Sequence, residues 1–114
     1  MDIKHIISSF KGLTTQKKKD KLVSVLKSLQ DKDAVFASLL QKVLHDEQND
    51  DTLLVLYYDI MKFAQAIETY NISQDKSALD QTQVYMQKLR DREKQEQIAT
   101  AAELAEIEAE LENI

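Results

Sequence analysis

The 114-residue sequence contains no cysteine, no proline and a single glycine. Without cysteine, neither a disulfide framework nor a thiolate metal site can form. Tight turns, sheet corners and phosphate-binding loops depend on glycine and proline, so their scarcity argues against a β-rich fold and against a glycine-loop nucleotide site. The chain length is typical of one domain, and the sequence predicts an all-α fold.

Long apolar runs are also lacking. No run approaches the roughly 20 residues that a membrane span needs. The opening "MDIKHIISSFKG" is interrupted by polar residues too early to be a secretory signal. The absence of cysteine fits a reducing compartment, and we therefore expect a cytoplasmic protein.

Helical spacing of apolar residues predicts a small bundle of about four helices, followed by one long C-terminal helix. The expected elements are 2–10, 15–30, a third that follows "DKD" at 31–33 and ends near His45, and 52–70. The last of these is apolar on nearly every face, as is typical of a buried central helix. Ser73 is the predicted cap of a further helix that continues to the C-terminus.

This C-terminal helix of about forty residues would be roughly 60 Å long, so we expect its second half to overhang the bundle or to mediate association. Its polar middle, "RDREKQEQ", is interpreted as a solvated part of one straight helix. The predicted division is a bundle domain at 1–94 and an acidic amphipathic extension at 95–114. Four residues of the extension follow the 3–4–3 spacing of a coiled coil over about two heptads. They are Leu104, Ile107, Leu111 and Ile114.

Charge is divided unevenly along the chain. Residues 1–44 hold nine lysines against four acidic residues, whereas residues 45–114 hold six basic against sixteen acidic residues. In a dimer of C-terminal helices, Glu103, Glu108 and Glu110 would face other glutamates. The tail is therefore expected to bind a basic apolar groove. That groove could be the lysine-rich start of the second helix, on the same chain or on a symmetry mate, or an unrelated basic partner.

The lysine-rich segment suggests a second kind of partner. Lysines at helical spacing can neutralise a phosphate backbone without reading sequence. The alternative is a solvated helix face or a counter-charge for the acidic tail. The residues of this candidate nucleic-acid site are Lys11, Lys17, Lys18, Lys19 and Lys21.

No pattern in the sequence indicates catalysis, a metal site or a cofactor. His5 and His45 lack partners at metal-ligand spacing. Glu103, Glu106 and Glu110 share a helix face, but the Glu-x-x-His pairs of carboxylate-bridged metal bundles are missing. No nucleophile elbow or other catalytic signature occurs.

The leading hypothesis is a non-enzymatic helical interaction or adaptor module. Its acidic amphipathic C-terminal helix would dock on a basic apolar groove of a protein partner or of a second copy. The alternative is a nucleic-acid-associated or ribosome-associated accessory factor that uses the lysine segment.

Overall fold

The computed structural model describes residues 2–45, 48–95 and 100–112, and all regular structure in these ranges is helical. The all-α prediction is confirmed. None of the helices is long and apolar enough to cross a membrane over the described ranges, and the cytoplasmic location stays a prediction. The helices are α1 (Ile3–Lys11), α2 (Thr15–Leu29), α3 (Ala34–His45), α4 (Asp50–Ser73), α5 (Lys76–Lys94) and α6 (Ala101–Glu112).

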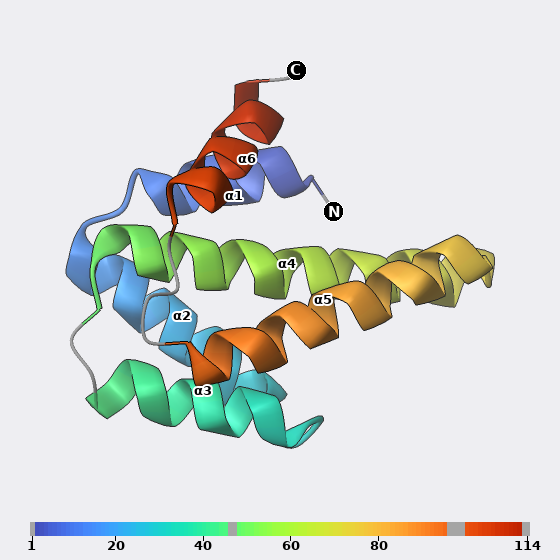
Figure 1. Cartoon of the computed structure of the whole chain (residues 1–114), viewed down its shortest axis with the longest axis horizontal. Helices are drawn as coiled ribbons and strands as arrows, with labels where there is room; N and C mark the ends of the chain where they lie inside the picture. The colour runs from blue at the N-terminus through green and yellow to red at the C-terminus, as the bar shows by residue number, and fades with distance from the viewer. Residues whose placement is uncertain (1, 46–47, 96–99, 113–114) are drawn as a thin grey trace.

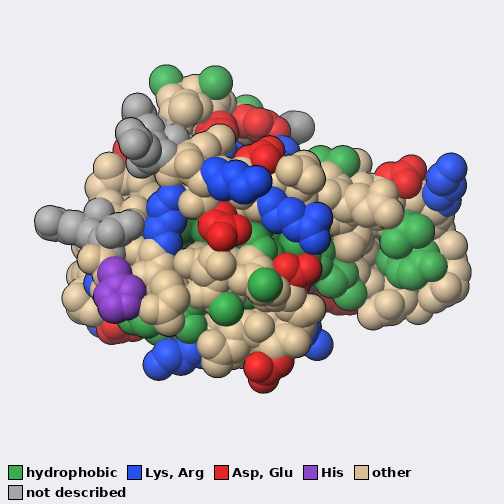
Figure 2. Space-filling view, turned by 60° about the horizontal axis from the view of Figure 1, so that its bottom comes forward, with side chains coloured by type: hydrophobic (Ala, Val, Ile, Leu, Met, Phe, Trp, Pro, Cys, Tyr) green, Lys and Arg blue, Asp and Glu red, His purple; other side chains and the backbone are tan. Residues whose placement is uncertain are grey.

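Helices α4 and α5 form an antiparallel hairpin through the centre of the molecule (Figure 1). α2 and α3 pack on one side of it, and α1 and α6 lie on the other. Residues 52–60 of α4 are all buried, so the prediction of a buried central helix is confirmed. The free end of the hairpin projects beyond the other helices, and hydrophobic side chains lie on its surface (Figure 2).

Short polar side chains cap the helices where the sequence offers them. Thr14 accepts a hydrogen bond from the Lys17 amide at 3.3 Å and caps the start of α2. The prediction for Ser73 is wrong, because α4 continues to that residue. Asp75 caps α5 instead, and Gln74 makes the turn with a positive φ of 55°.

The prediction of one long C-terminal helix is wrong. α5 ends at Lys94, and Gln95 has an extended backbone with φ −83° and ψ 138°. The Lys42 ammonium of α3 donates hydrogen bonds to the carbonyl oxygens of Arg92, Glu93 and Gln95. A lysine that satisfies the last carbonyls of a helix stabilises its end. The break is therefore stabilised from another helix and needs no proline or glycine nearby.

The chain then returns over the bundle as α6, which contacts α1 and α4. The longest dimension of the molecule is 39 Å, so no helix in the described part of the chain overhangs by the expected amount. The polar run at 90–97 is not uniformly solvated, because Arg92 is buried. The predicted boundary at 94/95 coincides with the end of α5, while the independent folding of 1–94 and a coiled coil between copies stay predictions.

Candidate functional site: the groove under the C-terminal helix

α6 packs on α1 and α4, and its first turn contacts Arg92 of α5. We call the surface of these three helices that α6 covers the α6 groove. Ile107 is the apolar centre of the contact: it is only 2% exposed and belongs to the main hydrophobic core. Leu104 and Leu111 are half-buried and pack against the same core. Ile114, the fourth apolar residue of the predicted interface, lies outside the described residues.

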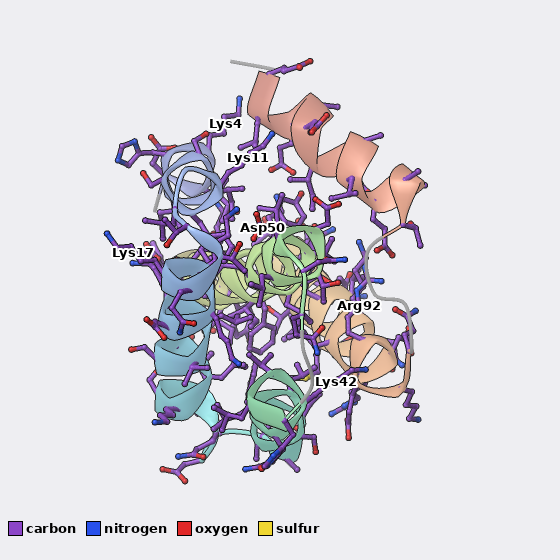
Figure 3. All side chains as sticks on the ribbon, turned by 90° about the vertical axis from the view of Figure 1, so that its left-hand side faces the viewer. Lys4, Lys11, Lys17, Lys42, Asp50 and Arg92 are labelled. Atoms are coloured by element: carbon purple, nitrogen blue, oxygen red, sulfur yellow. The ribbon has the colours of Figure 1, made fainter. Side chains whose placement is uncertain are left out.

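The start of α6 is held by a buried arginine of α5. The Arg92 Nε donates to Asp59 Oδ2 of α4 at 3.0 Å, and Arg92 Nη1 donates to Glu103 of α6. Arg92 and Asp59 are 6% and 2% exposed. Figure 3 shows Arg92 between α5 and α6. A guanidinium with its fork of donors suits this role, because one side chain serves two carboxylates.

The pKa shifts at this end show a balance between burial and pairing. Burial raises the pKa of Asp59, and the neighbouring Arg92 guanidinium only partly offsets that effect. Burial alone would lower the pKa of Arg92, but the hydrogen bonds and charges of Asp59 and Glu103 outweigh it, so its pKa is raised. Arg92 therefore remains a cation. Asp59 binds a proton more readily than an exposed aspartate does.

The other end of α6 is held by Glu110. The Lys62 Nζ of α4 lies 2.9 Å from Glu110 Oε1, and the Tyr58 hydroxyl donates to Glu110 Oε2. Burial alone would raise the pKa of Glu110, but the hydrogen bond from Tyr58 and the charge of Lys62 lower it. Burial, together with the adjacent Glu110 carboxylate, raises the pKa of Tyr58. Glu110 is thus held as a carboxylate by both partners.

A third contact joins α6 to α1. Lys11 Nζ lies 3.4 Å from Glu108 Oε1, and both side chains are about half exposed. Such an exposed pair contributes only about 0–1 kcal/mol. Lys4 and Lys11 extend from α1 towards α6 (Figure 3). Three helices therefore each supply a cation to the acidic face of α6.

A cavity of about 340 Å³ remains between α4, α5 and α6. Lys88 and Arg92 line it together with Asp59, Glu103 and other acidic side chains. Glu103 Oε2 is buried there and accepts no hydrogen bond from the described residues. A buried polar atom without a partner costs about 1–3 kcal/mol. No group of three or more His, Cys, Asp or Glu side chains in the described ranges is arranged to hold a metal ion.

The lysines of the candidate nucleic-acid site differ in exposure and in ion-pair partners. Lys18 is buried and lies 3.4 Å from Asp50 Oδ2, while Lys11 pairs with α6. Lys17 and Lys21 are exposed and Lys19 is half-buried. Nucleic-acid binding through these residues stays a prediction.

The sequence predicts a basic groove, but most of the residues that pair with α6 lie outside the predicted lysine-rich segment. The described residues pair Lys11, Lys62 and Arg92 with α6, and of these Lys11 alone belongs to the lysine-rich segment. A usable signal was present: Asp59 and Lys62 are the charges that interrupt an otherwise apolar helix. Charged residues on a buried helix are almost always paired. Arg92 gave no such signal, because it stands in a run of polar residues.

Comparison with protein-family models, with curated proteins and with solved structures finds no match for this chain.

Proposed function

We propose that this chain is a non-enzymatic helical interaction module, in which the acidic amphipathic helix α6 and the basic apolar α6 groove form the binding pair. α6 occupies its own groove in the closed form and exchanges into the matching groove of a partner. We assign this exchange to a second copy of the chain, because an identical chain has an identical groove. Exchange of an identical element between protomers is a low-cost route to dimers.

One observation carries the proposal: Ile107 is buried at the centre of α6, and cations from three helices pair with the glutamates around it. The centre supplies the hydrophobic contact, worth roughly 1.5–3 kcal/mol for one isoleucine. The surrounding pairs define which helix fits and in which orientation. Helix α6 has Thr100 as its N-cap, whose hydroxyl accepts from the Glu103 amide at 3.3 Å. The N-cap therefore belongs to the α6 segment itself and stays with the helix when it binds another groove.

The contact is small enough to exchange. Ile107 is the only α6 side chain in the described range that is fully buried. The outer pair with Lys11 is exposed, and Glu103 keeps one unpaired oxygen. A competitor must still overcome an effective concentration that is of the order of millimolar for a short linker. Displacement is expected at high protein concentration rather than at trace concentration.

The first test uses the full chain with Ile107→Asp, which places a charge at the buried centre and releases α6. A labelled peptide of residues 100–112 should then bind the opened groove, and its affinity should fall as salt screens the ion pairs. Ala105→Asp is the matched control, since Ala105 is an exposed residue of the same helix. Equal peptide binding by the two variants would show that the groove is not the binding site.

The second test asks whether copies exchange α6. Wild-type chains labelled separately with donor and acceptor dyes at α6 and at α4 are mixed at high concentration. Energy transfer should develop between copies, and light scattering should show dimers. The Ile107→Asp chain should show neither signal. Wild-type chains that stay monomeric without transfer would contradict self-association.

A further inference from the structure

A second hollow lies on the flank of α1 that faces away from α6. At 100° per residue, Ile6 lies about 140° around the helix axis from Lys11, which points to α6. Ile6 and Phe10 of α1, Leu13 after it, Tyr57 and Met61 of α4 and Lys21 of α2 line this hollow. We call it the α1–α2 hollow. Its occupant cannot be the chain's own docked α6, because that helix is held on the opposite flank by Lys11.

The floor of the hollow is aromatic and buried. The rings of Phe10 and Tyr57 stack with their centroids 4.0 Å apart and their planes 7° from parallel. Both residues are buried, at 1% and 2% exposed. Offset stacked rings attract each other beyond their hydrophobic burial.

The walls of the hollow are apolar and only half covered. Ile6, Leu13 and Met61 pack against the core but keep part of their surface exposed. Methionine adapts its shape to different apolar partners and is frequent at binding surfaces. The volume is about 370 Å³, within the range of about 300–1,000 Å³ that is usual for binding pockets. The hollow can therefore take a large apolar side chain.

The rim carries positive charge. Among the residues that the structure describes, no aspartate or glutamate lines the hollow; Lys21 is its charged lining residue, and His5 lies beside it. Lys17 precedes Lys21 by four residues and so lies on the same face of α2. Figure 3 shows Lys17 on the side of the molecule away from α6. The nearby Asp20 accepts a hydrogen bond from Gln16 at 2.8 Å.

We infer that the α1–α2 hollow is a docking site for an acidic amphipathic helix of a partner protein. One large apolar side chain of that helix enters the hollow between Ile6, Leu13 and Met61. The carboxylates of the helix meet Lys17 and Lys21. In helix-in-groove recognition, an amphipathic helix places apolar side chains from successive turns into a hydrophobic groove. A nucleic acid fits less well, because the rings are buried as a floor and offer no exposed face on which a base could stack.

The test follows the full chain by methyl NMR during titration with a designed peptide. The peptide is a helix of glutamate and alanine with leucine at every third or fourth position and one central tryptophan. We expect the methyl signals of Met61 and Ile6 to shift while that of Ile107 stays in place. A shift of Ile107 instead would mean that the peptide takes the α6 groove, and would overturn the inference.

Charge variants distinguish docking at the hollow from non-specific binding of the peptide. Lys17→Gln with Lys21→Gln should weaken peptide binding roughly fivefold and reduce its salt dependence. The matched control is Lys27→Gln with Lys32→Gln, two exposed lysines further along the chain. Equal weakening by both pairs would overturn the inference, as would unchanged affinity in the first.

Two further probes identify the class of occupant. A peptide with lysine in place of every glutamate should not shift Met61. Laurate, an apolar chain with a single carboxylate, should not shift it either. Binding of laurate without binding of the acidic peptide would assign the hollow to a lipid acid and refute a protein partner. Binding of the lysine peptide would show that charge does not select the occupant, and would overturn the inference of an acidic partner.

Discussion

Replacing Arg92 with methionine tests the balance of charge and burial beneath α6. Methionine keeps much of the arginine volume and removes its charge. Asp59 then stays 2% exposed without its guanidinium partner at 3.0 Å. Removal of one partner from a buried ion pair costs about 3–5 kcal/mol, because the remaining charge is left uncompensated. We expect the free energy of unfolding at neutral pH to fall by that amount.

The same variant makes a prediction about pH. Burial already raises the pKa of Asp59, and the loss of the Arg92 charge raises that pKa further. A carboxyl group whose pKa is higher in the folded state than in the unfolded state stabilises the fold as pH falls, because the folded protein takes up the proton first. The deficit of Arg92→Met should therefore shrink as pH falls from neutral towards about 4, the pKa of an unfolded aspartate.

Urea unfolding followed by circular dichroism, at several pH values, measures both effects. Arg90→Met is the matched control: Arg90 is about half exposed, pairs with Asp33 at 3.5 Å, and should cost at most about 1 kcal/mol. The double variant with Asp59→Asn should be more stable than Arg92→Met alone at neutral pH. A deficit below about 1 kcal/mol, or one that does not change with pH, would refute this account of the buried pair.

Two further predictions concern α6 and the hairpin turn. The pKa of Glu110 is lowered in the folded state, so its contribution to α6 docking should be present above about pH 4.3, the unfolded value, and should be lost as pH falls through the folded pKa. An NMR titration of wild type and Tyr58→Phe measures this: the variant should have a higher Glu110 pKa, and an unchanged pKa would contradict the role of the hydroxyl. Gln74 has a left-handed backbone with φ 55°, which costs a non-glycine residue about 1–2 kcal/mol. Gln74→Gly should therefore raise the free energy of unfolding by up to about 1 kcal/mol in thermal or urea unfolding, and a destabilised variant would show that the side-chain hydrogen bonds of Gln74 outweigh the strain.

The first four helices were predictable because their signals are local. Apolar stripes, cap residues and the buried character of 52–70 are all written in neighbouring residues. The boundary of α4 was misplaced by a few residues at each end, since Asn49 rather than a later residue caps it. The polar turn before α4 offers several adjacent cap residues, so the apolar spacing predicts the helix correctly but does not fix the residue at which it begins.

The end of α5 was not predictable in this way. Residues 75–114 contain no proline or glycine, and their apolar stripe stays in phase across the polar run. The break depends on Lys42, which lies about fifty residues earlier in sequence and donates to the final carbonyls of α5. The same break places α6 so that its Glu103 accepts a hydrogen bond from Arg92. Long-range contacts of this kind override local helix propensity, and a single sequence does not reveal them.

The charge distribution of the chain follows from this arrangement. The acidic C-terminal half does not meet the basic N-terminal half as two opposed surfaces, because the cations that pair with α6 come from α1, α4 and α5. Apolar burial of Ile107 alone would let α6 settle in several registers, since alanines and leucines flank it on both sides. Glu103 at Arg92 and Glu110 at Lys62 select one register, because a shift along the groove would leave the buried Arg92–Asp59 pair without its third member. Buried pairs of this kind contribute little net stability, and their best-attested use is to fix register. A groove that selects register by charge and binds by one apolar anchor is suited to an exchangeable helix, because the same pairs re-form wherever an identical groove is presented.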